Sequence, residues 1–358
     1  MNFKFLSDYT AVKFTGIDRV FDIPEYFLKF SIGSFSGQVK FYGLIIMSGF
    51  VLAVLFGGRM AWKWKMNINK MLDVLIYGTF FGILGARLYY VVFQWGYYSS
   101  NLNEIFKIWE GGLAIYGGLI GGVIGGFLVC KIEKLNFYNL MDLAGMSFLI
   151  GQGIGRWGNF TNQEAFGTNT TLPWGMWSEK VAGFFPASYV PAGFDPSAPV
   201  HPTFLYESLW CLAGFGILYF ICKKYRKFSG QVILCYGIWY GLGRVFIEGL
   251  RTDSLYIGST SIRVSQLLSA LIVVASVTLL IMKLRKYIKN PQPIEGIDFF
   301  PDVENKETKE KKNKDEILIE EKTKESAAET VNEEKDEPKK PDTETVSDET
   351  VEDEDVPE

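Results

Sequence analysis

The sequence has few residues of the kinds that form metal or disulfide sites, with one histidine and four cysteines among 358 residues. His201 has no cysteine, histidine or acidic residue around it at the spacing of metal ligands, so we expect no metal. No nucleotide-binding glycine loop and no nucleic-acid motif is present, so we expect no nucleic-acid partner. The cysteines show no paired spacing that indicates a disulfide framework, and all lie within or at the ends of apolar segments: Cys130, Cys211, Cys222 and Cys235.

The C-terminal part lacks the residues that build a core. Residues 301–358 contain no aromatic residue, no glycine and no cysteine, and such a composition buries too little apolar surface to fold. Residues 291–358 hold 25 acidic side chains against 10 lysines, a charge of −15, which leaves +11 for the rest of a chain whose net charge is −4. We predict a disordered acidic tail over residues 286–358. A solvated extension explains this composition better than a docking arm for a protein partner.

The first 40 residues lack a continuous apolar run before a small-residue cleavage site, which excludes a cleavable signal peptide. Membrane insertion then depends on internal segments. The region carries five lysines and arginines mixed with four acidic residues. We predict that residues 1–40 form an arm along the outer face of the membrane, a place that suits the aromatic residues Phe27, Phe30, Phe35 and Phe41.

Seven predominantly apolar segments each have the roughly 20 residues that a membrane span needs. They cover residues 41–60, 72–95, 113–130, 140–158, 203–222, 231–250 and 265–284. Lysine and arginine collect after the first, third, fifth and seventh segments, and loops of this kind face the cytoplasm. We therefore predict an all-α integral membrane protein with seven transmembrane helices over residues 41–285, its N-terminus outside and its C-terminus cytoplasmic.

Charged residues interrupt the outer halves of these segments. Arg87, Arg156 and Arg244 each lie in an otherwise apolar stretch, and a charge at the centre of the bilayer costs about 2.5 to 3.5 kcal/mol. Arg244, Glu248 and Arg251 are spaced four and three residues apart, which puts them on one stripe of a helix. Further polar residues fall at the outer ends of the segments: Tyr42, Tyr116, Asn159, His201, Tyr206 and Glu207. The pattern predicts a site in the outer leaflet, from the interface to about 12 Å below it.

The guanidinium group of Arg156 offers a planar fork of donors that matches a phosphate group. Alone, it is equally consistent with a side chain that reaches to the lipid head groups, but Arg244 and Arg87 at a similar depth favour an anion site. For the charged stripe over residues 244–251, a structural ladder of ion pairs is the alternative. His201 is followed by a proline and is likewise consistent with an ordinary helix start.

Glycines recur at four-residue spacing over residues 117–126, which predicts close packing against another membrane helix. The preceding residues 110–116 differ, because two glycines there stand at a loop-to-helix entry beside an acid and a phenol. Backbone amides at such an entry can hold an anionic head group.

Five stretches together resemble the prolipoprotein diacylglyceryl transferases of bacteria. They are residues 85–90 (GARLYY), 109–122, 155–164 with Gly167, 201–207 (HPTFLYE) and 243–253. The block RWGN at 156–159 is the most specific of them. The resemblance runs from about residue 42 to about residue 285 and leaves out the acidic tail.

The resemblance implies an enzyme of the bacterial cell membrane that transfers the diacylglyceryl group of phosphatidylglycerol to the lipobox cysteine of prolipoprotein signal peptides. A thioether forms and glycerol phosphate is released, as the first step of lipoprotein maturation, and no soluble cofactor is implied. This reaction fits a site in the outer leaflet, arginines that hold a lipid phosphate, and a signal-peptide helix that enters sideways from the membrane lipid.

The resemblance also implies roles for single residues. Arg156 corresponds to the arginine that binds phosphatidylglycerol, and Arg244 to a second essential arginine that pairs with Glu248. Where many members have a histidine this chain has Tyr116, so a histidine base at that position is excluded. We assign catalysis to Arg156, Arg244, Tyr116, Glu164 and Glu248, and substrate binding to Arg156, Asn159, Gly167, Tyr42, Arg87, Asp142, Arg251, His201 and Glu207.

A cysteine thiol has an ordinary pKa near 8.5, so it needs a base or a positive field to become a thiolate. The candidates are Tyr116, His201, Glu164 and Glu248, and we favour the arginine field with Tyr116 hydrogen-bonded nearby.

Two other functions compete with this interpretation. A small-anion or lipid transporter would place charges on both sides of the midplane or repeat one half of its sequence, and the sequence shows neither pattern. A structural scaffold whose tail is the active part leaves the charged stripe unexplained.

Overall fold

The computed structural model describes residues 2–33, 35–186, 190–191, 193–252 and 263–294. The chain divides into two units, Met1–Phe300 and Pro301–Glu358, and the described residues all belong to the first. From residue 295 onward the predicted acidic tail lies outside the described residues, as does Asp253 of the family stretch.

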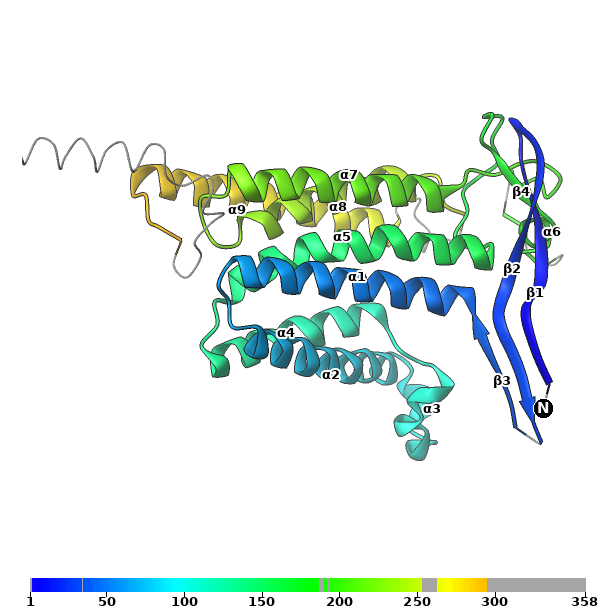
Figure 1. Ribbon diagram of the computed structural model, residues 1–358, viewed down its shortest axis with the longest axis horizontal. Helices are drawn as coiled ribbons and strands as arrows, with labels where there is room; N and C mark the ends of the chain where they lie inside the picture. The colour runs from blue at the N-terminus through cyan, green and yellow to red at the C-terminus, as the bar shows by residue number, and fades with distance from the viewer. Residues whose placement is uncertain (1, 34, 187–189, 192, 253–262, 295–358) are drawn as a thin grey trace, which may run out of the picture. The chain divides into compact units, whose positions relative to one another are not determined.

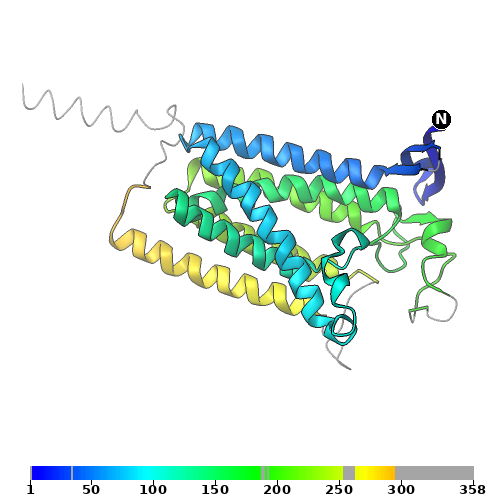
Figure 2. The same ribbon diagram turned by 90° about the horizontal axis from the view of Figure 1, so that it is seen from below.

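Long helices dominate the described part of the chain and lie side by side, as Figures 1 and 2 show. They are α1 (Phe41–Lys63), α2 (Ile68–Phe93), α4 (Ile115–Glu133), α5 (Phe137–Asn162), α7 (Thr203–Lys224), α8 (Gln231–Glu248) and α9 (Val264–Lys289). Five of them, α1, α2, α4, α7 and α9, are long and apolar enough to cross a membrane. Helices α5 and α8 do not reach that apolar composition, and they carry Asp142, Arg156, Arg244 and Glu248. The prediction of a mostly helical membrane protein is confirmed.

The prediction that the protein is all-α is wrong for its N-terminal region. Three N-terminal strands and one later strand form an antiparallel sheet in the order β3-β2-β1-β4. They are β1 (Asn2–Phe14), β2 (Ile17–Ile32), β3 (Phe35–Lys40) and β4 (Met176–Ser178). The scattered charges of this region favour an irregular arm, but aromatic and β-branched residues mixed with polar ones are also typical of strands. In Figure 1 the strands run across the ends of the helices.

Short helices occupy two of the connections. Between α2 and α4 lie α3 (Trp95–Tyr98) and the 3-10 helices η1 (Leu102–Phe106) and η2 (Ile108–Glu110), and α6 (Glu179–Ala182) directly follows β4.

Glycines pack α2 and α4 against each other, as their spacing predicts. A Cβ atom added to Gly85 would lie 2.5 Å from the carbonyl oxygen of Gly117, and one added to Gly117 would lie 2.4 Å from that of Gly85. Only residues without a side chain permit this approach of two backbones. Here the glycines are structural residues.

Buried apolar residues of α1, α5, α7 and α8 form one cluster. A buried polar group joins the end of α1 and the starts of α5 and α8, and Figure 1 shows these helix ends opposite the sheet. Arg226 donates from Nε to Asp142 Oδ2 at 2.8 Å and from Nη2 to Asn139 Oδ1 at 2.6 Å, and its guanidinium lies 4.7 Å from the ring centre of Trp64. Asp142 also accepts two backbone N–H groups at the start of α8, each at 2.8 Å. These four side chains form what we call the closed cluster, because the side chains of Asp142 and Arg226 are both 0% exposed.

Candidate functional site

The carboxylate of Glu207 is the centre of the site. It lies near the start of α7 and is only 5% exposed. Glu207 forms ion pairs with Arg156 of α5, with Arg244 of α8 at 3.3 Å, and with Arg251 just beyond α8 at 3.4 Å. Three guanidinium groups from different parts of the chain therefore meet at one buried carboxylate. With Glu248, described next, these residues form what we call the arginine cluster.

Arg244 has a second carboxylate partner in Glu248, one turn further along α8. The Oε2 atom of Glu248 lies 2.5 Å from Nη2 of Arg244, and Glu248 is buried. This pair joins two members of the predicted stripe and is the ion pair that the structural alternative expects, whereas the third member, Arg251, lies beyond the end of α8. The ion pairs of Glu207 are not explained by pairing along one helix, because they connect α5, α7 and α8.

Some of the N–H donors of Arg156 remain available to a ligand. Its Nε atom faces Glu207, and among the described residues no hydrogen bond engages its two terminal nitrogens. The side chain is 23% exposed, so an anion can reach it. A guanidinium held in this way presents N–H donors in the geometry that a phosphate group accepts.

The chain turns back on itself directly after α5. Gln163 adopts a left-handed conformation, with φ of 56°, and this ends the helix. The turn lets Asn159 donate from Nδ2 to Glu164 Oε1 at 2.9 Å. Asn159 and Glu164, both predicted site residues, therefore stabilise the loop that follows Arg156.

Gly167 is the point where three segments of the chain meet. Its N–H donates to the carbonyl oxygen of His201 at 2.9 Å, and its backbone pairs with that of Arg251 as an isolated β-bridge. A Cβ atom on Gly167 would lie 2.8 Å from Cβ of His201 and 2.9 Å from the carbonyl oxygen of Leu250. No side chain fits here, so a glycine is needed to hold Arg251 and His201 beside this loop.

His201 is held through a short chain of hydrogen bonds. Its Nδ1 atom lies 3.2 Å from the hydroxyl of Tyr206, which accepts from the indole N–H of Trp174 at 2.7 Å. A tyrosine hydroxyl that accepts a hydrogen bond through its oxygen can still donate its own hydrogen, here to Nδ1. Burial lowers the pKa of His201 below its usual 6.5, so the ring is neutral at pH 7. Across the described ranges, no three histidine, cysteine or acidic side chains group as metal ligands would.

Tyr42, near the start of α1, borders the same turn of α5. A Cβ atom on Gly158 would lie 3.0 Å from Cδ2 of Tyr42, so the tyrosine ring packs directly on the helix there. Gly158 lies between Arg156 and Asn159 in the sequence. The structure therefore brings Tyr42 to the turn of α5 that carries both of these predicted site residues.

The sequence model of the family described as prolipoprotein diacylglyceryl transferase matches residues 29–282. The chain belongs to this family. Over 258 residues it is 43% identical to the phosphatidylglycerol--prolipoprotein diacylglyceryl transferase of Finegoldia magna, which covers 72% of this chain and 96% of that protein. The protein of the same name from Staphylococcus aureus strain Newman is also 43% identical over 258 residues, covering 72% of this chain and 89% of that protein. The predicted family and the predicted transferase class are confirmed.

Asp142 does not lie where the sequence predicts it. It belongs to the closed cluster, 14 residues before Arg156 on the same helix, which separates the two by about 21 Å. The structure therefore does not bring Asp142 together with Arg156, and its predicted role in substrate binding stays a prediction. The sequence shows that an acidic residue lies within an apolar segment, but only the fold shows that Arg226 forms an ion pair with it.

The guanidinium group of Arg87 also donates its hydrogen bonds to groups within the protein. Its Nε donates to the carbonyl oxygen of Ile105 at 2.7 Å, and its terminal nitrogens donate to those of Glu104, Lys107, Gly111 and Gly112. A guanidinium has five N–H donors, and these five carbonyl groups use them. Arg87 therefore holds the connection between α2 and α4, and its predicted role in substrate binding stays a prediction.

Tyr116 stands in the first turn of α4 and is 42% exposed. Within the described part of the chain, its hydroxyl has no hydrogen-bond partner. Its role in catalysis stays a prediction.

The sequence analysis missed a polar contact between α5 and α8. Gln152, one turn before Arg156, donates from Nε2 to the hydroxyl of Tyr236 at 2.9 Å. Its Oε1 atom is buried without a hydrogen-bond partner among the described residues. A signal for it exists, because Gln152 is the only amide side chain in the segment 140–158.

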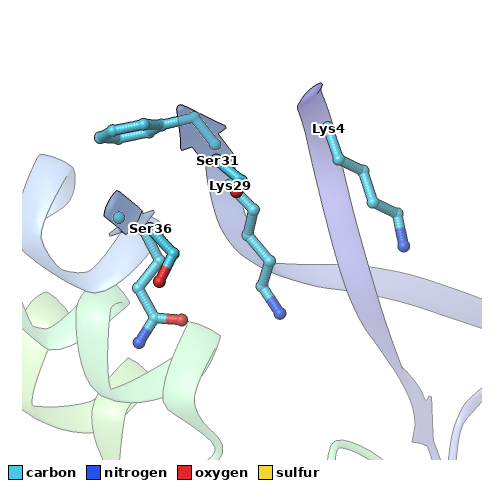
Figure 3. A pocket seen from close by; sticks show the side chains of 7 residues that line it. Lys4, Lys29, Ser31 and Ser36 are labelled. Atoms are coloured by element: carbon cyan, nitrogen blue, oxygen red, sulfur yellow. The ribbon is translucent and has the colours of Figure 1, made fainter. Parts of the chain in front are cut away.

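A hollow on the N-terminal sheet is not part of this site. Figure 3 shows Lys4 on one strand and Lys29, Ser31 and Ser36 on the neighbouring ones. Lys29 is paired with Asp8. No predicted site residue lines the hollow, so it adds nothing to the arginine cluster.

Proposed function

We propose that this chain transfers the diacylglyceryl group of phosphatidylglycerol to the thiol of the lipobox cysteine in prolipoprotein signal peptides. A thioether forms and glycerol phosphate is released. The observation that carries the proposal is the convergence of Arg156, Arg244 and Arg251 on Glu207, with the terminal nitrogens of Arg156 available to an anion. The names of the two relatives, which specify phosphatidylglycerol and a prolipoprotein, support the same two substrates.

The phosphate of the lipid is the group that the arginines bind. Arg156 and Arg244 hold its oxygen atoms, while Glu207 and Glu248 keep Arg244 in place through ion pairs at 3.3 and 2.5 Å. As the carbon–oxygen bond breaks, negative charge builds on the leaving phosphate. Donors that are already oriented toward such charge typically stabilise it by about 2.7 to 4 kcal/mol each.

The thiol sulfur attacks the carbon that bears the phosphate ester, and the electron pair of the broken carbon–oxygen bond leaves with glycerol phosphate. The thiol loses its proton before or during the attack, because the thiolate is the nucleophile. Two of the four candidate bases are occupied, since Glu248 pairs with Arg244 and Glu164 accepts from Asn159. We therefore assign thiolate formation to the positive field of the arginines, which lowers the thiol pKa so that the leaving glycerol phosphate takes up the proton. Tyr116 orients the thiol, and neutral His201 is the alternative base.

We place the arginine cluster at the outer leaflet of the bacterial cell membrane, in a protein with seven spans, an external N-terminus and a cytoplasmic C-terminus. The end of α5, the start of α7 and the end of α8 together build the cluster, so it lies at one end of the helices. Basic residues occupy the last turns of α1, α4 and α7 at the opposite end, which supports a cytoplasmic position for that end: Lys63, Lys131, Lys223 and Lys224.

The test is transfer of a radiolabelled diacylglyceryl group from phosphatidylglycerol to a lipobox peptide by the purified protein. Wild type is compared with Arg156→Ala, with Arg156→Lys, which keeps the charge but loses the fork, and with Arg59→Ala as a control at an exposed arginine. We expect label on the cysteine of the peptide with wild type and Arg59→Ala. We expect none with Arg156→Ala, and an intermediate rate with Arg156→Lys.

Two results would contradict the proposal. If folded wild type supplied with phosphatidylglycerol transfers no label, the reaction is wrong. If Arg156→Ala transfers label at a near-normal rate, the assignment of Arg156 is wrong. A peptide with serine in place of the lipobox cysteine checks that the thiol is the acceptor.

A further inference from the structure

Trp210 of α7 and Trp239 of α8 make a reciprocal contact. Their rings stack with centroids 4.4 Å apart and 20° between the planes. The indole N–H of Trp210 donates to the carbonyl oxygen of Trp239 at 3.0 Å, and the indole N–H of Trp239 donates to that of Trp210 at 2.9 Å. Because an indole N–H without an acceptor is costly in an apolar environment, both bonds favour one spacing of the two helices.

Each tryptophan also rests on a glycine of the other helix. A Cβ atom on Gly214 would lie 2.2 Å from Nε1 of Trp239, and one on Gly243 would lie 2.4 Å from Nε1 of Trp210. In both helices the glycine follows the tryptophan by four residues. We call these four residues the tryptophan lock. Any side chain larger than hydrogen at either glycine forces the helices or the rings apart.

The tryptophan lock lies next to the arginine cluster. Trp210 follows Glu207 by three residues, a rise of about 4.5 Å along α7, and Gly243 directly precedes Arg244 on α8. The ion pair between Glu207 and Arg244, at 3.3 Å, connects the same two helices. A change in the spacing of α7 and α8 therefore changes the place of the Arg244 guanidinium relative to Arg156 and Glu207.

We propose that the tryptophan lock sets the position of Arg244 for the lipid phosphate by fixing the spacing of α7 and α8. Its members are positioning residues, which act through Arg244 without touching the substrate. The inference rests on the function proposed above, in which Arg244 binds the phosphate of phosphatidylglycerol.

The chain offers a matched pair of variants on α7. Gly214→Ala puts a methyl group against Trp239, whereas a Cβ atom on Gly216, two residues further, meets nothing within 4 Å. We expect Gly214→Ala to lower kcat/KM for phosphatidylglycerol about tenfold or more at an unchanged KM for the lipobox peptide, because Arg244 acts on the leaving phosphate and a misplacement of about 1 Å can lower a catalytic rate about 100-fold. Gly216→Ala should stay within about twofold of wild type in both constants.

Trp239→Phe tests the same inference if Gly214→Ala does not fold, since it removes the indole N–H and part of the ring without adding atoms. We expect it also to lower kcat/KM for phosphatidylglycerol at an unchanged KM for the lipobox peptide. The inference is overturned if both variants keep the wild-type kcat/KM for the lipid, or if the loss disappears when the rate is expressed per folded enzyme. Absence of transfer by wild type and by Gly216→Ala would instead overturn the proposed function, and the inference with it.

Discussion

Helix α5 contributes to a contact between a carboxylate and an arginine at each of its ends, and the two contacts differ in exposure. In the closed cluster the side chains of Asp142 and Arg226 are both 0% exposed. In the arginine cluster the side chains of Arg156 and Arg244 are 23% and 20% exposed around a buried Glu207. The closed cluster uses its charges to hold helices together, whereas the arginine cluster keeps donors that an anion can reach. A charge within a span therefore identifies a binding site only when some of its donors remain accessible.

The largest effect is expected from breaking the closed cluster. Asp142→Ala leaves the Arg226 guanidinium buried without its carboxylate, and breaking one partner of a buried pair costs about 3 to 5 kcal/mol. We expect a large fall in the unfolding temperature of the purified protein, measured in detergent, and a low yield. The double variant Asp142→Ala, Arg226→Met should recover part of the loss, because it removes both charges.

The control for this variant is Asp18→Ala, at an exposed acid in the N-terminal sheet. An Asp142→Ala protein that unfolds at the wild-type temperature would show that the closed cluster does not hold the helices. A stable Asp142→Ala protein that has lost its affinity for phosphatidylglycerol would return Asp142 to the binding site.

A smaller effect is expected at Tyr116, beside the accessible end of the helices. Tyr116→Phe removes one neutral hydroxyl, and a neutral hydrogen bond contributes about 0.5 to 1.5 kcal/mol, so the variant should keep transfer within about tenfold of wild type. Tyr116→His should be tolerated, because in the proposed mechanism this position orients the thiol and does not need to remove its proton. Complete loss of transfer by a folded Tyr116→Phe protein would make the tyrosine hydroxyl essential to the reaction.

The smallest effect is expected at Glu25, a carboxylate between two lysines near the surface. Burial alone would raise its pKa, but ion pairs with Lys40 at 2.9 Å and Lys180 at 3.0 Å lower the pKa from 4.5 to about 2. A carboxyl group with a lowered pKa in the folded state stabilises the fold above its ordinary pKa and loses this contribution as the pH falls toward the folded value. Near the surface the contribution is about 1 kcal/mol or less.

Glu25→Gln removes this contribution. The unfolding temperature of the variant should lie slightly below that of wild type at pH 7, and the difference should shrink between pH 4.5 and pH 2. A difference that stays constant down to pH 2 would mean that Glu25 acts by packing and not by charge.

The membrane helices could be predicted from the sequence because the thickness of the bilayer imposes a length of apolar chain on each span. Five of the predicted segments are helices long and apolar enough to cross a membrane, and the other two, over α5 and α8, are helical. The residues of the three N-terminal strands are typical of strands and they pair with their neighbours in sequence, so the part of the sheet that no local pattern predicts is β4. Strand β1 pairs with β4, which begins at Met176, and such a pairing between distant segments leaves no local signal in either of them.

For the candidate site, the sequence alone determined which charged residues enter the spans and which of them share a stripe, since the helical repeat places residues three and four positions apart on one face. It also determined the family, through short stretches of specific residues. Only the tertiary structure decided which of these charges meet. Glu207 is the centre of the arginine cluster. Arg87 instead donates hydrogen bonds to the loop between α2 and α4, and Asp142 forms an ion pair with Arg226. The reason is that a contact between helices depends on the rotation and spacing of each helix against its neighbours, and many residues along the whole chain set these together.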